Sequence, residues 1–212
     1  DKDSFLFSKV NEVGYDWIFD IFEDREGNLW FASMGSGVWK HNPQANSFEK
    51  YINKEGEPNS LSSNSVSSVM QDSKGRIWLS TDRGGICRYN AETNDFTSFS
   101  IKEGLPDDVA YEILEDDAHN LWFGTNKGLV KFNPETKDIH VFTTKDGLLG
   151  NQFNYKSALK VGDGRFFFGG INGLIAFDPN ISRQQLAPPS PIYIPKFSIY
   201  NKEITVHTPN SP

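Results

Sequence analysis

The chain has 212 residues, of which 37% are hydrophobic and 14% aromatic, with a formal net charge of −7 and one cysteine, Cys87. The apolar content suffices for a sizeable core, the acidic balance disfavours a nucleic-acid partner because it repels phosphate, and the lone cysteine excludes a disulfide framework or a thiolate metal site. No apolar run is long enough to span a membrane, and because the chain begins at Asp1 without a signal peptide, we expect a mature segment or an excised piece.

A tandem repeat of about 45 residues runs through the chain. Its clearest landmark is an aromatic residue that recurs at intervals of 48, 44 and 45 residues: Trp30, Trp78, Trp122 and Phe167. An aspartate lies six residues before each tryptophan, and a glycine follows each landmark aromatic residue by six or seven positions: Gly37, Gly85, Gly128 and Gly173. The four copies lie near residues 15–53, 63–101, 108–144 and 153–180.

Each copy is predicted to form four short strands. The first is an alternating apolar run, such as 66–69 or 110–113. A turn that begins with Asp leads to the second strand, at 29–31, 77–79, 121–123 and 166–168. A turn that ends at the landmark glycine leads to the third, such as 129–132, and an Asn-Pro or Asp-Pro pair separates it from the fourth, at 48–51, 96–99 and 139–142.

These elements predict an all-β fold of four β-propeller blades, each a four-stranded antiparallel sheet. No helix is predicted, because no run of useful length has a 3.6-residue period. A β-solenoid is the alternative, although its repeats are usually shorter. Strands two and three are apolar on both faces, as a sheet between two neighbouring sheets requires. We therefore expect the landmark aromatic residues to pack between blades and, with the landmark glycines, to be structural.

The fourth copy lacks its fourth strand, because a Pro-rich connector follows Asp178-Pro179. Residues 4–7 resemble a spare outer strand, since Phe7 precedes Ile18 by the same eleven residues that separate Phe99 from Ala110. Three arrangements remain open: a segment of a larger ring, a four-bladed ring that residues 4–7 close, and two chains that pool eight blades. The first is favoured, and its exposed edges are expected to drive self-association.

The motif Asp-x-x-Gly-Asn/Arg-Leu/Ile-Trp-Phe/Leu, followed by Gly-Leu/Ile/Val and Asn-Pro, strongly resembles the two-component regulator propeller repeat. The links at 57–66 and 103–108 also fit, and 146–154 resembles the segment that leads into such a propeller's last blade. Residues 189–204 resemble the start of the β-sandwich called the triple-tyrosine (Y_Y_Y) domain. We therefore interpret 1–182 as propeller blades and 183–212 as a Pro-rich linker with the first strand of that sandwich.

This resemblance carries functional implications, because the repeat builds the extracytoplasmic sensor of hybrid histidine kinases, best known in gut Bacteroides. It implies a periplasmic, ligand-sensing segment of a membrane-anchored parent protein that binds an oligosaccharide or similar carbohydrate breakdown product and signals through rearrangement of a homodimer. Kinase activity would belong to other domains, so no enzymatic activity is expected of this segment. The alternatives are the propeller of a glycan-active lyase or glycosidase, and a protein-docking scaffold.

Chemical motifs are sparse, and we predict no catalytic residue, no metal site and no cofactor. The chain has no nucleophile elbow, zinc signature or phosphate-cradling loop. Its four histidines are scattered and are expected in solvated or turn positions: His41, His119, His140 and His207. The acidic run 115–117 lacks the alternating pattern of a calcium loop, so it is interpreted as a solvated turn.

Ligand contacts are expected from loops, because packing occupies the blade cores. One candidate segment carries two aromatic residues and an acid outside the repeat pattern: Tyr15, Asp16 and Trp17. Its alternative role, which we favour, is a strand extension that packs on the neighbouring blade. The turns that contain Arg83, Lys127 and Asn172 are equivalent, so these side chains are expected on one face.

The second candidate segment leads into the last blade and concentrates amides, an aromatic ring and a cation: Asn151, Gln152, Asn154, Tyr155 and Lys156. Amides and cations can hydrogen-bond sugar hydroxyls or carboxylates, and aromatic faces stack on sugar rings. The alternative is a structural clasp between the propeller and the domain that follows it.

Overall fold

The computed structural model describes residues 9–14, 16–180, 198–199 and 202–203. The chain divides into two compact units, Asp1–Asn180 and Ile181–Pro212. In the second unit the described residues form a two-stranded hairpin of β16 (Ser198–Ile199) and β17 (Lys202–Glu203). The spare outer strand at 4–7 lies outside the described residues, as do most of the linker and the sandwich strand interpreted at 183–212, so these interpretations stay predictions.

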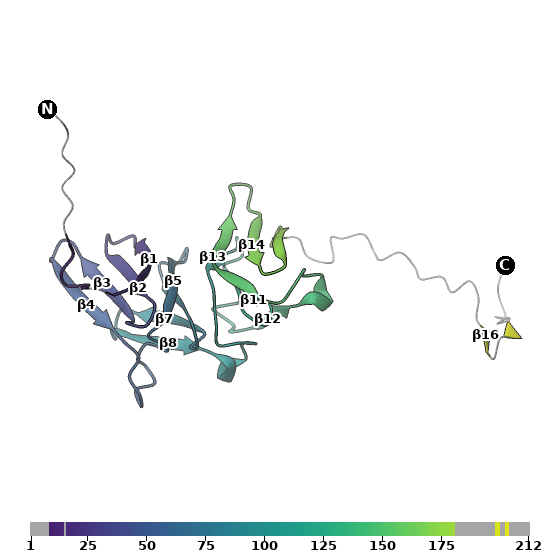
Figure 1. The fold of residues 1–212 in the computed structure, drawn as a ribbon. Coiled ribbons are helices and arrows are strands. Elements are labelled where there is room, and N and C mark those ends of the chain that lie inside the picture. The colour runs from purple at the N-terminus through teal and green to yellow at the C-terminus, as the bar shows by residue number, and fades with distance from the viewer. Residues whose placement is uncertain (1–8, 15, 181–197, 200–201, 204–212) are drawn as a thin grey trace. The chain divides into compact units, whose positions relative to one another are not determined.

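The first unit is all-β and consists of four antiparallel sheets in a propeller arrangement, as predicted (Figure 1). Blade 1 contains β1 (Ile18–Glu23), β2 (Leu29–Ser33), β3 (Val38–Asn42) and β4 (Ser47–Tyr51). Blade 2 contains β5 (Val66–Gln71), β6 (Ile77–Thr81), β7 (Ile86–Asn90) and β8 (Asp95–Phe99). Blade 3 contains β9 (Ile113–Glu115), β10 (Leu121–Gly124), β11 (Leu129–Phe132) and β12 (Ile139–Phe142). Blade 4 contains only β13 (Phe153–Lys160), β14 (Phe166–Gly170) and β15 (Gly173–Phe177).

Strands follow one another in chain order within every blade, and the first strands contact one another across blades, so they line a common axis. Two details differ from the prediction. Strand β9 begins at Ile113 rather than Ala110, because the amide of Ala110 donates to the carbonyl of Thr81 in blade 2. The linkers also contain two single-turn 3-10 helices, η1 (Ile101–Glu103) and η2 (Thr144–Asp146), each closed by a capping box.

The landmark tryptophans are buried between successive blades, as expected. Trp30 and Trp78 are fully buried and Trp122 is 4% exposed. Each packs on the ring at one equivalent position of β7, β11 or β15 in the next blade, with centroid distances of 5.1, 5.9 and 5.1 Å for Trp30–Tyr89, Trp78–Phe132 and Trp122–Phe177. Phe167 is only half-buried, because no described blade follows blade 4.

The aspartate of the repeat explains the six-residue spacing to tryptophan. Asp24, Asp72 and Asp116 each accept a hydrogen bond from the indole Nε1 of the tryptophan six residues later, at 2.9, 2.8 and 2.8 Å. The same carboxylates accept backbone amides of their own turn. Burial alone would raise the pKa of Asp24, but hydrogen bonds from Trp30 and Asn28 hold it below its ordinary value.

Asp116 also corrects one interpretation. The acidic run 115–117 is not simply a solvated turn, because Asp116 is 2% exposed. Its carboxylate accepts hydrogen bonds from the Trp122 indole and from backbone amides of the turn. The turn at His119 is of the same type as its glycine-containing counterparts, and His119 occupies the left-handed region at φ 65°, which is mildly strained for a residue with a side chain.

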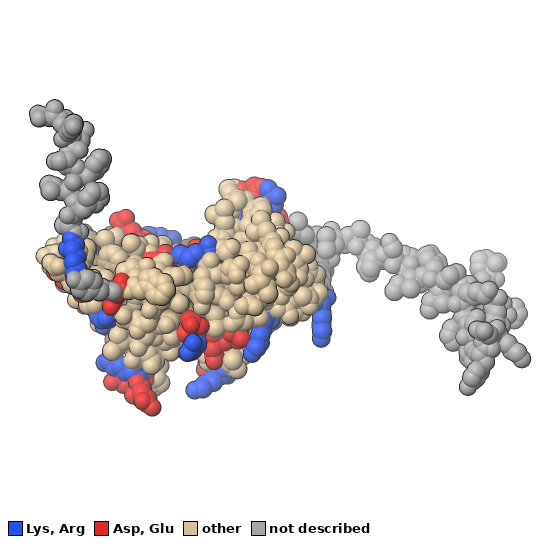
Figure 2. All heavy atoms as spheres, viewed as in Figure 1, with Lys and Arg blue, Asp and Glu red and all other residues tan. Residues whose placement is uncertain are grey.

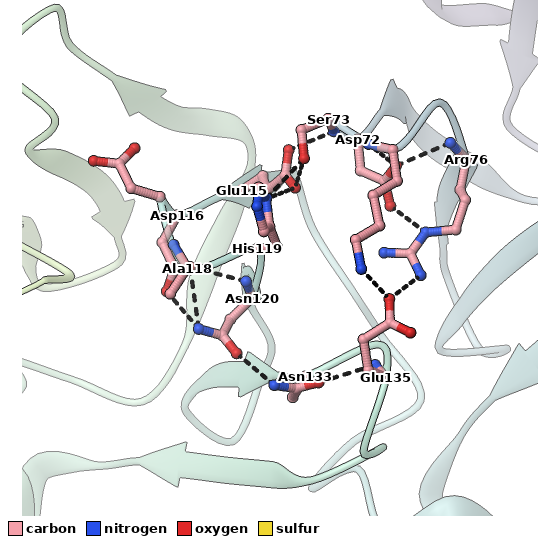
Figure 3. Close-up of polar contacts among 12 residues, drawn as sticks. Asp72, Ser73, Arg76, Glu115, Asp116, Ala118, His119, Asn120, Asn133 and Glu135 are labelled. Carbon is pink, nitrogen blue, oxygen red and sulfur yellow. Dashed lines mark hydrogen bonds and ion pairs between the residues drawn. The ribbon is translucent and has the colours of Figure 1, made fainter.

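The turns of blades 2 and 3 are also linked directly to each other (Figure 3). The amide of Ser73 donates to Glu115 at 2.7 Å, and Ser73 Oγ also contacts the Nδ1 of His119 at 2.8 Å. Glu135, from the turn between β11 and β12, receives Lys74 Nζ at 2.7 Å and Arg76 Nη1 at 2.8 Å. These contacts fix one blade to the next at the end of the propeller that carries the β1–β2 type turns.

The part of the chain that the structure describes contains no helix of the length and apolar character needed to cross a membrane.

Candidate axial site on the linker face

Because each blade is an antiparallel meander, the second turn of every blade and the linkers between blades lie at the same end of the propeller. We call this end the linker face; it comprises the turns 34–36, 82–84, 126–127 and 171–172 and the linkers 52–65, 100–112 and 143–152. Backbone hydrogen bonds join turns to linkers, for example Gly35 N to the Asn64 carbonyl at 3.0 Å and Gly85 N to the Asp108 carbonyl at 2.7 Å. Arg83 and Lys127 lie in these turns with exposed side chains, and so does Asn172, as predicted.

A charged cluster joins three blades at the axis near this face. Lys156 Nζ, from β13, lies 2.8 Å from Asp20 Oδ1 of β1 and 3.7 Å from Glu112 Oε1, which precedes β9. Asp20 Oδ2 accepts the amide of Val69 at 2.9 Å, and Glu112 Oε2 accepts the amide of Ala158 at 3.4 Å. Each acid therefore binds the inner strand of the following blade, and one ammonium group bridges both acids. We call Asp20, Glu112 and Lys156 the axial cluster.

A β-bulge directs Lys156 toward the axis. The register between β13 and β14 shifts between Phe153 and Ala158, and Lys156 itself has φ 48°, in the left-handed region. A non-glycine residue in this region stores strain, and such strain persists where the surrounding contacts impose it. The ion pairs with Asp20 and Glu112 supply those contacts.

Aromatic rings adjoin the axial cluster. Tyr155 meets Tyr111 edge-on at a centroid distance of 4.7 Å and Phe19 at 5.6 Å. The Tyr111 hydroxyl donates to Asn126 Oδ1 at 2.7 Å. Burial, with the neighbouring charge of Tyr155 and Asp107, raises the pKa of Tyr111 to about 12, and burial with the charge of Asp82 also raises the pKa of Tyr155. Both phenols therefore stay protonated at neutral pH and can act as hydrogen-bond donors.

In the first predicted segment, residues 15–17, one side chain is structural and another is free for contact with a ligand. The side chain of Asp16 is structural: its carboxylate accepts Trp39 Nε1 at 2.8 Å and pairs with Lys50 at 3.0 Å, and the Trp39 hydrogen bond holds the pKa of Asp16 below its ordinary value. Trp17 is 72% exposed, which does not fit a packed strand extension. Tyr15 lies outside the described residues.

The second predicted segment is also divided. Asn151 Oδ1 caps the linker helix η2 by accepting the amide of Thr144 at 2.9 Å, so this side chain has a structural partner. Gln152 and Asn154 are exposed, whereas Tyr155 and Lys156 are directed into the axial site. The structure thus brings Tyr155 and Lys156 together with Phe19, which lies two residues after Trp17.

The sequence interpretation missed Asp20, Glu112, Phe19 and Tyr111. A signal was present, because the repeat aligns Asp20 and Glu112 with Ser68 and Ser157, one position before an apolar residue in each first strand. An acid on an inner strand beside a packed blade has to find a partner. The partner itself could not be read from the repeat, since Lys156 occurs in one copy only.

The site offers hydroxyl, ammonium and carboxylate groups beside aromatic rings, which suits recognition of a polar small molecule better than bond cleavage. Among the residues that the structure describes, no group of three His, Cys, Asp or Glu side chains is arranged to hold a metal ion. On the face shown in Figure 2, acidic and basic side chains are interspersed, and neither sign covers a whole blade.

Substituting Lys156 with methionine tests the axial cluster directly. The change leaves Asp20 and Glu112 without their cation, and both are largely buried, so we expect the free energy of unfolding to fall by about 1–2 kcal/mol. Chemical denaturation at low and high salt measures it, and salt should narrow the difference. Lys127→Met is the matched control, because Lys127 is 62% exposed and has one carboxylate partner at 3.4 Å. Equal losses for both variants would contradict an axial role.

These features define the chain as a β-propeller segment, and comparison with known proteins identifies the repeat. The model of the two component regulator propeller matches residues 13–35, 60–83 and 104–127. Each matched segment contains the first two strands of a blade and the turn between them. Three of the four copies of the repeat therefore match the two component regulator propeller, as the motifs implied.

The similar proteins include a histidine kinase and the extracellular domains of two-component systems. The chain is 29% identical over 98 residues to Histidine kinase P4 of Formosa agariphila, a match that covers 46% of this chain and 7% of the kinase. The extracellular domain assigned to hybrid two component system BT3049 of B. thetaiotaomicron superposes with a TM-score of 0.70 at 27% identity, covering 90% of this chain and 26% of that one. The extracellular domain of system BT4673 gives 0.63 at 26% identity, covering 77% and 23%. This chain thus spans about a quarter of those domains.

Proposed function

We propose that this chain is the ligand-sensing propeller segment of a periplasmic sensor region in a membrane-anchored hybrid two-component histidine kinase, and that its ligand is an oligosaccharide released by carbohydrate breakdown. The coarser part of this proposal is supported by the similarity to extracellular domains of hybrid two-component systems. The finer part rests mainly on one observation: a strained bulge holds Lys156 and Tyr155 beside residues of two other blades, with Lys156 paired to Asp20 and Glu112.

The chemistry of the site fits a sugar. Trp17 presents an exposed indole, Tyr155 a half-buried ring, and Gln152 and Asn154 exposed amides, so stacking and hydrogen bonding to hydroxyl groups are both available. A ligand oxygen that binds Lys156 would compete with Asp20 and Glu112. Since those contacts join blades 1, 3 and 4, binding would change how the blades are held together.

Such a change can become a signal only if the ligand favours one arrangement over another. We infer that the ligand-bound arrangement alters how two sensor copies sit in a homodimer. Neither the enzyme nor the scaffold alternative needs a ligand-sensitive axial cluster, so they make different predictions.

A thermal-shift and calorimetry screen with oligosaccharides of neutral, acidic and amino sugars tests the proposal. One class should raise the unfolding temperature, and Trp17→Ala, Tyr155→Ala and Lys156→Ala should each weaken its binding at least about tenfold. Lys74→Ala is the control, because Lys74 lies in the turn between β5 and β6, at the end of the propeller opposite to the linker face. A flat response from the intact sensor would contradict the proposal, and glycan turnover by the chain would instead favour the enzyme alternative.

A further inference from the structure

A groove opens between blades 1 and 2 at the end of the propeller opposite to the linker face. Its volume is about 850 Å³, within the usual range of small-molecule sites. Three turns form its walls: 24–28 between β1 and β2, 72–76 between β5 and β6, and 91–94 between β7 and β8. Lys40, from β3, also lines it, with its ammonium group over the buried rings of Trp30 and Tyr89. We call this hollow the turn groove.

The corresponding place between blades 2 and 3 is bridged by ion pairs. Glu135, in the turn between β11 and β12, reaches the β5–β6 turn of blade 2 (Figure 3). Its Oε1 receives Lys74 Nζ at 2.7 Å and Arg76 Nη1 at 2.8 Å. These two cations follow the buried Asp72 by two and four residues. One glutamate thus ties the last turn of blade 3 to the first turn of the blade before it.

The turn groove has the same glutamate but lacks the two cations. Glu92 is equivalent to Glu135, since the two lie in the related turn sequences Asn-Ala-Glu-Thr and Asn-Pro-Glu-Thr. In blade 1 the positions of the two cations, two and four residues after the buried aspartate, are held by Glu26 and Asn28. Glu92 therefore shares the groove with a second carboxylate, and like charges cannot bridge the junction as they repel each other.

Charges of both signs in the turn groove are left without an opposite partner. Glu26 is exposed, and its carboxylate has one donor, a glutamine amide at 3.4 Å. Glu92 is exposed too, and its side chain makes no hydrogen bond or ion pair with the residues that the structure describes. Among the same residues, Lys40 contacts no carboxylate, and its ammonium lies 5.4 and 5.1 Å from two aromatic ring centroids. One ligand with separated charges would satisfy both signs.

We propose that the turn groove binds a small zwitterion, an amino acid or a short peptide. The ammonium group of the ligand takes the place of the missing cations and pairs with Glu26 and Glu92, while its carboxylate pairs with Lys40. Hydrogen bonds between ionised groups are stronger than those between neutral groups, so a ligand that carries both charges is favoured over one that carries a single charge. The site is separate from the axial cluster and independent of the proposed sugar ligand.

Calorimetric titration with glycine, triglycine and trialanine tests the site, because these probes differ in the separation of their charges. At least one should bind with a Kd of about 1 mM or tighter, and added salt should weaken its binding. Acetylating its amine or amidating its carboxylate should each weaken binding at least about tenfold. The inference is overturned if none of the three binds at about 10 mM, or if a blocked probe binds as well as the free one.

Two glutamine variants locate the binding. Glu92→Gln removes a charge from the turn groove and should weaken binding at least about tenfold. Glu135→Gln is the matched control, because it removes the equivalent carboxylate of blade 3, which already has its cations, and binding should stay unchanged. Equal binding by the wild type and Glu92→Gln, or equal losses in both variants, contradicts the assignment.

A double variant fills the groove from within. Glu26→Lys with Asn28→Arg places in blade 1 the two cations that blade 2 has at these positions. Glu92 should then pair with them as Glu135 does with Lys74 and Arg76, so binding of the zwitterion is lost while the protein stays folded. Thermal unfolding checks the fold, and a folded double variant that binds as the wild type does would also overturn the inference.

Discussion

Replacing Asp72 with alanine is expected to lower the free energy of unfolding by about 3–5 kcal/mol, because the carboxylate is fully buried and satisfies several donors at once. Its Oδ1 accepts the amides of Lys74 and Arg76 at 3.0 and 2.9 Å. Its Oδ2 accepts Arg76 Nε at 2.6 Å and Trp78 Nε1 at 2.8 Å. The substitution leaves the buried indole N–H of Trp78 and the Nε–H of Arg76 without their acceptor, while Arg76 Nη1 keeps its contact with Glu135.

Two further variants test whether the loss of stability comes from the buried hydrogen bonds of Asp72 or from removing any carboxylate in such a turn. Asp163→Ala removes a carboxylate from the corresponding turn of blade 4, where it is half-exposed and pairs with Arg165, so we expect little change in the free energy of unfolding. The double variant Asp72→Val with Trp78→Phe should recover part of the loss, because donor and acceptor disappear together. Denaturant unfolding of all three measures the difference, and an Asp72→Ala loss as small as that of Asp163→Ala would contradict the role of the carboxylate.

Blade 4 naturally has apolar residues at the two positions that the double variant changes. Val161 occupies the position of the buried aspartate, since its amide and carbonyl make the same turn hydrogen bonds, and Phe167 stands six residues later in place of tryptophan. Ala176 replaces the cation that lies over the indole, as Lys40 does at 5.4 Å from Trp30 and Lys131 at 5.3 Å from Trp122. The carboxylate, the indole and the cation are therefore replaced as a set.

The blades could be predicted from the sequence because each landmark has a local cause. The spacing of Asp72 and Trp78 reflects one hydrogen bond across a turn and a strand, and that bond recurs in three copies. Such contacts join residues that are close in the sequence, so they recur in each copy of the repeat. The third-strand cation is equally regular, and an alignment by strand register would have revealed it.

The axial cluster could not be predicted in the same way. Lys156 lies far from Asp20 in the sequence, and its side chain reaches the axis only because a bulge and a left-handed backbone conformation redirect it. Neither the bulge nor the left-handed conformation can be recognised from the residues around Lys156, because lysine is not typical of either. The roles of Asp16 and Trp17 likewise depend on the neighbours that the fold supplies. Asp16 binds Trp39, whereas the adjacent Trp17 is exposed.

The largest effect is expected for Gly85→Ala, which should lower the free energy of unfolding by more than about 4 kcal/mol or prevent folding. Gly85 has φ 67°, and a Cβ there would lie 2.0 Å from the carbonyl oxygen of Phe99. That oxygen belongs to the fourth strand of the blade, β8, so the clash would separate the outer strand from β7. Gly37 and Gly128 make the same approach to Tyr51 and Phe142.

Gly173→Ala is the control that isolates the clash from the backbone strain. Gly173 also has a positive φ, 119°, but a Cβ there would meet nothing nearer than Leu149 Cδ1 at 3.6 Å, because blade 4 has no described fourth strand beside it. We expect this variant to lose about 1–2 kcal/mol from strain alone. Thermal and denaturant unfolding compare the two alanines. Similar losses would mean that the landmark glycines serve only the turn, whereas a gap of more than about 2 kcal/mol assigns them to the packing of strand four against the blade.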